Sequence, residues 1–582
     1  MKRIIKAIVL LILAAGIYAV FLNIRGDKDM DSEFKDSVNI ERKYYDNGLE
    51  AVAVQSSAAE DIVEIRIYVK TGSVYEDGYY GSGISHFLEH LTAEGPTEKK
   101  KKKEIDLLIE KFGNHFNAYT TKDHTCYYIT TTKKFYPQAL KLLGELVFEN
   151  KITEEAFKRE RGVIQREIEK SLEEPDRYLH RLTSENLYRV HPSRYPVIGH
   201  RELFEKITFG DIKNYYARRY RPDNAFIVIG GQLDAATVFK EVREAAGSYK
   251  RGFSELPVLP EEPLLTSVRE RKGFRDIEGG YLDISWLTIP IDHKDLYALD
   301  LLSEILSSGR NSRLNKIIKE EKELVNSIGS YSYTPSYGRG NFTVNARFKD
   351  AEPEEIERNI LEIIEEIKES GVTKKEMERA KKMAQSDYLF GQTSISGITS
   401  RVGIDILSTS NEYFSRHYLR NLKKVTAEEV RGAALKYLPM DRYARTVLLP
   451  EGSLFEEKKS TAPASPSAEK IKLKNGLTVI LRNIPGISVI NYDFFFKGGV
   501  TYDKIFETPG LFNFMSSMME RGTKNYGRVE LNEKFEERGA SFSVSSGNNT
   551  FYVKGSSLKE DSGYILKLLK EIVYEPSFDE GE

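Results

Sequence analysis

Hydrophobic and polar residues follow two different periods along this chain. Short stretches such as 62–69 and 281–287 are rich in β-branched and aromatic residues or alternate with polar ones, which predicts β-strands. Longer runs such as 354–368 and 374–388 place apolar residues at helical spacing among charged ones, which predicts amphipathic helices. Strands and helices mixed in this way predict an α+β fold in which antiparallel sheets carry helices.

The chain repeats its own beginning at an offset of 427 to 428 residues. Residues 68–76 return as 495–503, and residues 47–49 return as 475–477. Self-similarity at one offset indicates a duplicated subdomain. The copy is incomplete, because Glu582 corresponds to position 155 of the first copy.

The N-terminal segment has the pattern of an export signal or a membrane anchor. Basic residues precede 18 uncharged, mostly apolar residues at 7–24, and Arg25 follows them. Eighteen residues just reach the length that spans a bilayer, and the small-residue triplet at 14–16 lies inside the run rather than after it, which favours an uncleaved anchor. We therefore expect an extracytoplasmic protein: bacterial periplasmic, secreted or anchored in the inner membrane.

Cysteine content and charge exclude several other classes. No cysteine lies near the apolar segment, which excludes a lipoprotein anchor, and the single Cys126 excludes an intramolecular disulfide. The 86 basic and 88 acidic residues give a formal net charge of −2, so no global field favours nucleic acid. The lysine run at 99–103 is expected to be a solvated loop or helix start rather than a polyanion site.

Residues 86–90 read His-Phe-Leu-Glu-His, a pattern suited to holding a metal. On a helix, His86 and His90 lie one turn apart on the same face and can direct ring nitrogens at one ion. A catalytic zinc site typically takes three protein ligands. Glu167, in a segment with a helical pattern, is the candidate third ligand of a single zinc ion.

Two further acids complete the candidate site. Glu89 is free to act as general base, taking a proton from the attacking water and passing it to the leaving amine. Glu160 lies seven residues before Glu167 on the same helical face and is assigned a supporting catalytic role. The alternatives are a surface helix with two solvated histidines, and a structural zinc site, which fits poorly because such sites usually close with four Cys or His ligands.

The surroundings of the motif resemble the insulinase, or pitrilysin, family of inverted-motif zinc peptidases (M16-like). The resemblance covers nearly everything after about residue 38 and is carried by residues 83–91, 94–97, 116–125, 160–168, 306–314 and 323–328. It implies His86, His90 and Glu167 as zinc ligands, Glu89 as base and Glu160 as a supporting acid. It also implies repeated two-layer subdomains that form clamshell halves, the second half incomplete.

The family resemblance implies a substrate strand as well. Asn117 and Ala118 match the family's Asn-Ala-x-Thr segment, an edge strand to which an extended peptide adds itself. The alternative is an ordinary buried hairpin strand. In the repeat, residues 510–517 match the metal motif but lack both histidines and the glutamate, so that copy cannot bind the zinc.

The expected organisation has five parts: a signal or anchor at 1–26, a catalytic subdomain at 38–255, a second, non-catalytic subdomain at 263–455, a Pro/Ser/Lys linker at 456–469 and an incomplete third subdomain at 470–582. Full-length family members have four subdomains, and the missing part supplies an arginine and a tyrosine that help hold substrate. The chain is therefore either a fragment or one subunit whose partner chain, or a dimer, completes the chamber.

These observations favour a zinc metalloendopeptidase that cleaves peptides or unfolded polypeptide segments outside the cytoplasm. The alternative is a catalytically silent peptide-binding or scaffold subunit, since the resembled family includes members that have lost catalysis. The intact His86, Glu89, His90 and Glu167 argue against that alternative.

Overall fold

A computed structural model describes most of the chain after residue 37. The described residues are 38–451, 469–481 and 489–579, apart from gaps at 58–59, 114, 253–255, 392–393, 507, 509, 537, 539 and 548–549. They divide into two compact units, one ending at residue 454 and the other beginning at 455. The predicted apolar segment at 7–24 and nearly all of the predicted linker lie outside the described residues. Within the described ranges, no helix is long and apolar enough to cross a membrane.

The first sheet of the larger unit has six strands in the order β1-β2-β6-β3-β5-β4. Its strands are β1 (Val38–Tyr44), β2 (Glu50–Ser56), β3 (Ile62–Val69), β4 (Phe116–Thr120), β5 (Thr125–Thr132) and β6 (Ala225–Gly231). The predicted strand at 62–69 is confirmed as β3. Strand β4 forms one edge of this sheet.

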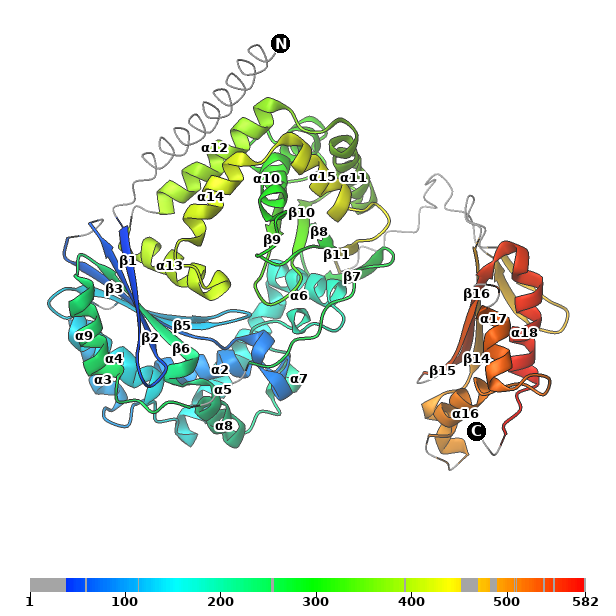
Figure 1. The fold of residues 1–582 in the computed structure, drawn as a ribbon, viewed down its shortest axis with the longest axis horizontal. Helices are drawn as coiled ribbons and strands as arrows, with labels where there is room; N and C mark the ends of the chain where they lie inside the picture. Colours follow the sequence, from blue (N-terminus) through cyan, green and yellow to red (C-terminus); the bar gives the residue numbers. More distant parts are fainter. Residues whose placement is uncertain are drawn as a thin grey trace, which may run out of the picture. The chain divides into compact units, whose positions relative to one another are not determined.

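Eight helices accompany this sheet in the described part of the chain. They are α2 (Ile84–Glu94), α3 (Lys102–Lys111), α4 (Tyr136–Phe148), α5 (Glu154–Glu173), α6 (Pro175–Leu187), α7 (Arg201–Phe204), α8 (Phe209–Arg219) and α9 (Ala235–Ala246). Helices α2, α4 and α9 pack on one face of the sheet (Figure 1). Their apolar sides and the strands enclose one continuous core that also takes in α5 and α8.

The opposite face of the first sheet is covered by a helix from far along the chain, α13 (Ile395–Thr409), which contacts β3 and β6. In Figure 1 this helix lies on the side of the sheet away from α4 and α9. Ile398, Val402 and Ile406 of α13 pack against a buried cluster that includes Tyr68 and Cys126. Burial raises the pKa of the Cys126 thiol to about 12, so this cysteine is a packing residue.

The second sheet has five strands in the order β7-β11-β8-β10-β9. The strands are β7 (Arg269–Arg275), β8 (Gly280–Leu287), β9 (Ser327–Tyr333), β10 (Asn341–Phe348) and β11 (Ala444–Pro450), and the helices with them are α10 (Leu296–Ser307), α11 (Pro353–Ser370), α12 (Lys374–Gly391), α14 (Phe414–Lys424) and α15 (Ala427–Tyr437). A π-helical turn spans Asn315–Glu321. The helices predicted at 354–368 and 374–388 are therefore found as α11 and α12.

Both sheets of the larger unit are mixed, whereas the sequence predicted antiparallel sheets. β2 runs parallel to β6, and β11 runs parallel to β7, while the other pairs are antiparallel. A parallel pair needs a long crossover connection. The chain provides one in each case, because helices α2 to α8 lie between β2 and β6, and α10 to α15 lie between β7 and β11. The α+β class itself is confirmed.

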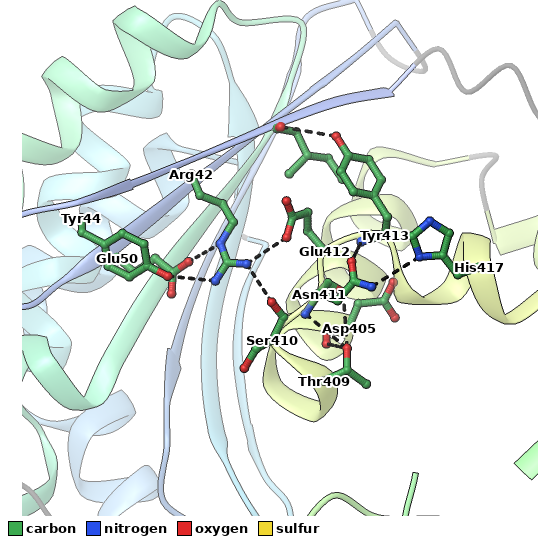
Figure 2. Close-up of polar contacts among 11 residues, drawn as sticks. Arg42, Tyr44, Glu50, Asp405, Thr409, Ser410, Asn411, Glu412, Tyr413 and His417 are labelled. Atoms are coloured by element: carbon green, nitrogen blue, oxygen red, sulfur yellow. Dashed lines mark hydrogen bonds and ion pairs between the residues drawn. The ribbon is translucent and has the colours of Figure 1, made fainter. Parts of the chain in front are cut away.

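A polar contact joins the two subdomains at the outer edge of the first sheet (Figure 2). Arg42 on β1 donates to Glu50 on β2 and, 2.8 Å away, to Glu412 in the turn between α13 and α14. It also donates to the carbonyl oxygen of Ser410 at 2.9 Å, a residue held in the left-handed region with φ 58°. One guanidinium thereby fixes the end of α13, the helix that covers the sheet.

The smaller unit repeats part of the first sheet. Its main sheet has the order β14-β16-β15, which corresponds to β3-β5-β4. Its elements are β12 (Glu469–Lys472), β13 (Thr478–Leu481), β14 (Val489–Lys497), β15 (Ser541–Ser546), β16 (Thr550–Leu558), α16 (Leu511–Met519), α17 (Arg528–Glu536) and α18 (Ser562–Tyr574). Helix α16 is the counterpart of α2.

The two copies share a detail at the start of these helices. In the first copy, Glu76 accepts a hydrogen bond from the backbone N–H of Ser85 at 3.0 Å. In the second, Asp503 accepts from the N–H groups of Gly510 at 2.8 Å and Phe512 at 3.1 Å. A carboxylate at a helix N-terminus satisfies free N–H groups and complements the helix dipole. The second copy keeps this acidic residue although it lacks the metal-binding residues, so the acid stabilises the fold rather than the metal site.

Candidate metal centre

Helix α2 presents the motif opposite its core face. Ile84, Phe87, Leu88 and Leu91 are buried in the main core. Residues three or four positions apart share a helical face, so this pattern directs His86, Glu89 and His90 away from the core. Helix α2 begins after Gly83, whose φ of 72° and whose close approach to the Ile198 carbonyl leave no room for a side chain.

Helix α5 brings the acidic residues to α2. Its N-cap Thr153 accepts a hydrogen bond from the N–H of Ala156 at 3.1 Å, which starts the helix. The rings of Phe87 and Phe157 lie 5.2 Å apart and join the two helices in the core. The packing places Glu160 and Glu167, on one face of α5, beside the histidines of α2.

The structure brings His86, His90 and Glu167 to a common point. Nε2 of His86 lies 3.9 Å from Oε2 of Glu167, and Nε2 of His90 lies 3.7 Å from the same oxygen. All three donor atoms lie within 4.8 Å of one another. Two atoms that each bind one ion at about 2.0–2.2 Å lie at most about 4.4 Å apart, and the separations of 3.9 and 3.7 Å fall within that limit. Within the described residues, no other three His, Cys, Asp or Glu side chains form such a group.

These donors fit zinc. Burial and the neighbouring His90 lower the pKa of His86 to about 3, which leaves the imidazole neutral with a free lone pair, the form in which histidine binds metals. Nδ1 of His86 is buried and has no hydrogen-bond partner among the residues that the structure describes. Two imidazoles and one carboxylate form a donor set found in catalytic zinc sites.

Glu160 lies behind His90 rather than with the three ligands. Its Oε2 is 3.5 Å from Nδ1 of His90, the ring nitrogen that does not face Glu167, and its Oε1 accepts from Arg159 at 2.9 Å. A carboxylate at the far nitrogen fixes the tautomer and orientation of a ligating histidine. The structure thus puts Glu160 in a supporting position and brings it into contact with no other predicted site residue.

Glu89 lies between His86 and His90 on α2, and its carboxylate is hydrogen-bonded to a residue of strand β4. Glu89 Oε2 accepts a hydrogen bond from the hydroxyl of Thr120 at 2.8 Å. The side chain is buried, and this burial raises its pKa. A raised pKa suits a group that takes up and returns a proton. Thr120 was assigned no role from the sequence, although it is the threonine of the Asn-Ala-x-Thr segment that begins at Asn117.

The predicted substrate strand is β4, at the edge of the first sheet. The N–H of Thr121 donates to His124, and that of Thr130 donates to His115, so residues 115, 117, 119 and 121 turn their backbone towards β5. The backbone N–H and C=O groups of Phe116, Ala118 and Thr120 therefore face the open edge. Asn117 is exposed, and its side-chain oxygen accepts from the N–H of Ala118 at 2.8 Å.

The second copy lacks a comparable site at the matching positions. On α16, Asn513 and Ser517 stand where the first copy has its two histidines, and Ser516 stands where it has the glutamate. The side chains of Ser516 and Ser517 donate back to the carbonyl of Asn513 instead. The scaffold therefore folds with or without a metal set.

A helix with two histidines and a glutamate beside a second helix with an acidic ligand is the arrangement of a zinc metallopeptidase. The model of Insulinase (Peptidase family M16) matches residues 51–201 and 478–582, and that of the Peptidase M16 inactive domain matches residues 206–384. The chain belongs to the M16 insulinase family of peptidases.

Curated relatives carry the name zinc protease. The chain is 28% identical over 416 residues to the uncharacterized zinc protease YmxG of Bacillus subtilis, a match that covers 71% of this chain and 99% of the relative. It is 26% identical over 356 residues to the zinc protease PqqE of Helicobacter pylori, covering 60% and 80%. These homologues imply zinc as the metal.

Solved structures share the fold. A protease from Helicobacter pylori superposes with a TM-score of 0.67 at 23% identity, covering 71% of this chain and all of that one. The ferredoxin protease FusC in complex with Arabidopsis ferredoxin gives a TM-score of 0.57 at 14% identity, covering 93% of this chain and 67% of that one. At these identities the likeness shows the fold alone.

Proposed function

We propose that this protein is a zinc-dependent endopeptidase that cleaves extended peptides or unfolded polypeptide segments. The observation that carries the proposal is the convergence of His86, His90 and Glu167 beside the buried carboxylate of Glu89. The three donors would hold a single zinc ion per chain. When bound, zinc would polarise the scissile carbonyl and acidify the attacking water.

Glu89 performs the proton transfers in this proposal. Its Oε2 is held by Thr120, which leaves Oε1 to take a proton from the attacking water. The same carboxyl group then gives that proton to the nitrogen of the leaving amine, so the base is regenerated when the peptide bond breaks. Glu160 holds the imidazole of His90 in place during the reaction.

Strand β4 would hold the substrate by its backbone. An extended peptide that adds to the open edge can bond to the N–H and C=O of Ala118, a mode of recognition that reads backbone more than side chains. The Asn117 side chain must first release the Ala118 N–H. Most segments of a folded protein already have their backbone groups paired, which supports unfolded segments as substrates.

We also propose that the protein acts outside the cytoplasm. The support is the basic N-terminus followed by 18 uncharged residues at 7–24. Fusing residues 1–40 to alkaline phosphatase, which is active only after export, tests this point. Loss of export when a lysine pair is placed within 7–24 is the expected control result.

A mixed peptide pool tests the endopeptidase assignment. Incubated with the chain and zinc, the pool should yield new internal cleavages by mass spectrometry, which disappear with a chelator and return with zinc. Peptides that bind the chain without being cut would instead favour the silent peptide-binding subunit.

A further inference from the structure

The hydroxyl of Thr120 links the proposed base to the proposed substrate strand. It donates to Oε2 of Glu89 over 2.8 Å, from the last residue of β4 to the middle of α2. Among the described residues, it is the one hydrogen-bond donor that reaches this carboxylate. The contact joins residues 31 positions apart in the sequence.

Other hydroxyl groups nearby are engaged elsewhere. Tyr127 and Tyr220 hydrogen-bond to each other at 2.8 Å, oxygen to oxygen. Thr125 donates to the carbonyl oxygen of Thr71 at 3.0 Å, which uses its one hydroxyl hydrogen. The hydroxyl oxygen of Thr120 also lies 3.3 Å from that of Thr125. The Glu89 oxygen at 2.8 Å is the nearer acceptor for the Thr120 hydrogen, and a hydrogen bond to an ionised carboxylate is among the stronger ones in proteins.

Strand alternation gives this contact a direct relation to the substrate. Ala118 and Thr120 are two residues apart, so both turn their backbone groups to the open edge and both direct their side chains to the face that carries α2. Ala118 would fix a bound peptide through its backbone, and Thr120 fixes Glu89 through its side chain. One short strand would thus fix the positions of both the base, Glu89, and the bound peptide.

We propose that Thr120 is a positioning residue that aligns Glu89 with the peptide held on β4, an inference that rests on the proposed function. Catalysis depends steeply on the placement of the proton acceptor. Without the hydroxyl, the Glu89 carboxylate keeps its burial but loses the one donor that reaches it from the described part of the chain, and it can rotate away from the attacking water.

Paired variants of the full 582-residue chain test this role. Thr120→Val removes the hydroxyl at nearly constant volume, and Thr120→Ser restores it. Thr130→Val is the matched control, because Thr130 also donates to a buried carboxylate on the same sheet, that of Glu64, but does not contact Glu89. The rates are measured on a quenched fluorescent derivative of a peptide that the wild-type chain cleaves, with zinc content recorded for each variant.

We expect Thr120→Val to lower kcat roughly ten-fold or more with KM within about two-fold of wild type and zinc content unchanged. Thr120→Ser should recover most of the loss, and Thr130→Val should match wild type. A Thr120→Val variant with wild-type kcat, a Thr120→Ser variant as slow as Thr120→Val, or a loss shared by Thr130→Val would overturn the positioning role. No cleavage by the wild type, or full turnover by Glu89→Gln, would overturn the proposed function and this inference with it.

Discussion

The carboxylate of Glu160 lies 3.5 Å from Nδ1 of His90, while Nε2 of the same ring faces Glu167 at 3.7 Å. The two acids of α5 therefore contact opposite nitrogens of one imidazole. Only one of them can share a metal ion with that histidine. This distinguishes the metal ligand, Glu167, from the supporting acid, Glu160.

Replacing the supporting acid should weaken zinc binding without abolishing it. Glu160→Gln removes the charge behind His90, and loss of such a partner typically costs roughly 10- to 100-fold in metal affinity. A competition titration with a zinc chelator measures the dissociation constant. Glu155→Gln, at an exposed position of the same helix, is the control and should bind zinc like wild type. Equal affinities for both variants would mean that Glu160 does not support His90.

Replacing the acidic ligand should remove the metal. Glu167→Ala leaves two imidazoles, which are too few protein ligands for a catalytic zinc site. The wild-type chain should retain a single zinc ion after gel filtration, measured by mass spectrometry of the metal, and the variant should retain almost none. Glu169→Ala, two residues further along α5 and exposed, should keep its zinc. Retention of zinc by Glu167→Ala would place the third ligand elsewhere.

Blocking one edge N–H should impair substrate use more than folding. Ala118→Pro removes an N–H that points away from β5, so the ladder between β4 and β5 is kept. We expect kcat/KM to fall roughly ten-fold with little change in the melting temperature. Tyr44→Pro makes the corresponding change in β1, the strand at the other edge of the sheet, and should leave kcat/KM intact. If Ala118→Pro cleaves peptides as well as wild type, the peptide does not bond to this N–H.

A buried acid in the second sheet should make stability depend on pH. Burial raises the pKa of Asp283 to about 6, although Thr183 donates to it at 2.7 Å. The folded protein therefore holds a proton at pH values where the unfolded chain has released it, so stability falls as the pH rises from about 4 to 6. The loss is at most about 3 kcal/mol. Denaturant unfolding at several pH values measures it.

Asp283→Asn should flatten this part of the pH profile, since an amide does not titrate. Asp276→Asn, at an exposed position between β7 and β8, should keep the wild-type slope. An unchanged slope in Asp283→Asn would show that another group controls stability in this range.

Local patterns predicted much of the fold. The periodicity that indicated strand 62–69 and helices at 354–368 and 374–388 follows the apolar core face of each element, which a sequence records directly. The burial of the other face of β3, where Glu64 and Arg66 lie against α13, was not visible in that pattern. The parallel pairing of β2 with β6 could not be found in this way, because it depends on which distant strands meet. Pairing partners leave no local period in the sequence.

The candidate metal centre, like the fold, could be predicted only in part from local spacing. His86 and His90 are one helical turn apart, so their shared face follows from spacing alone. The contact of Thr120 with Glu89 joins a strand to a helix and arises only when the two elements pack. Likewise, spacing placed Glu160 and Glu167 on one face of α5, but only packing against α2 shows that they contact different nitrogens of His90.

Cleavage by the wild-type chain and by Glu89→Gln, with zinc content measured on the same samples, tests the central claim most directly. The account predicts that both proteins hold zinc and that only the wild type cuts peptides from the mixed pool, because the amide cannot accept the proton of the attacking water. Wild-type turnover by Glu89→Gln would contradict the assigned base, and an uncut pool with both zinc-loaded proteins would contradict the peptidase itself.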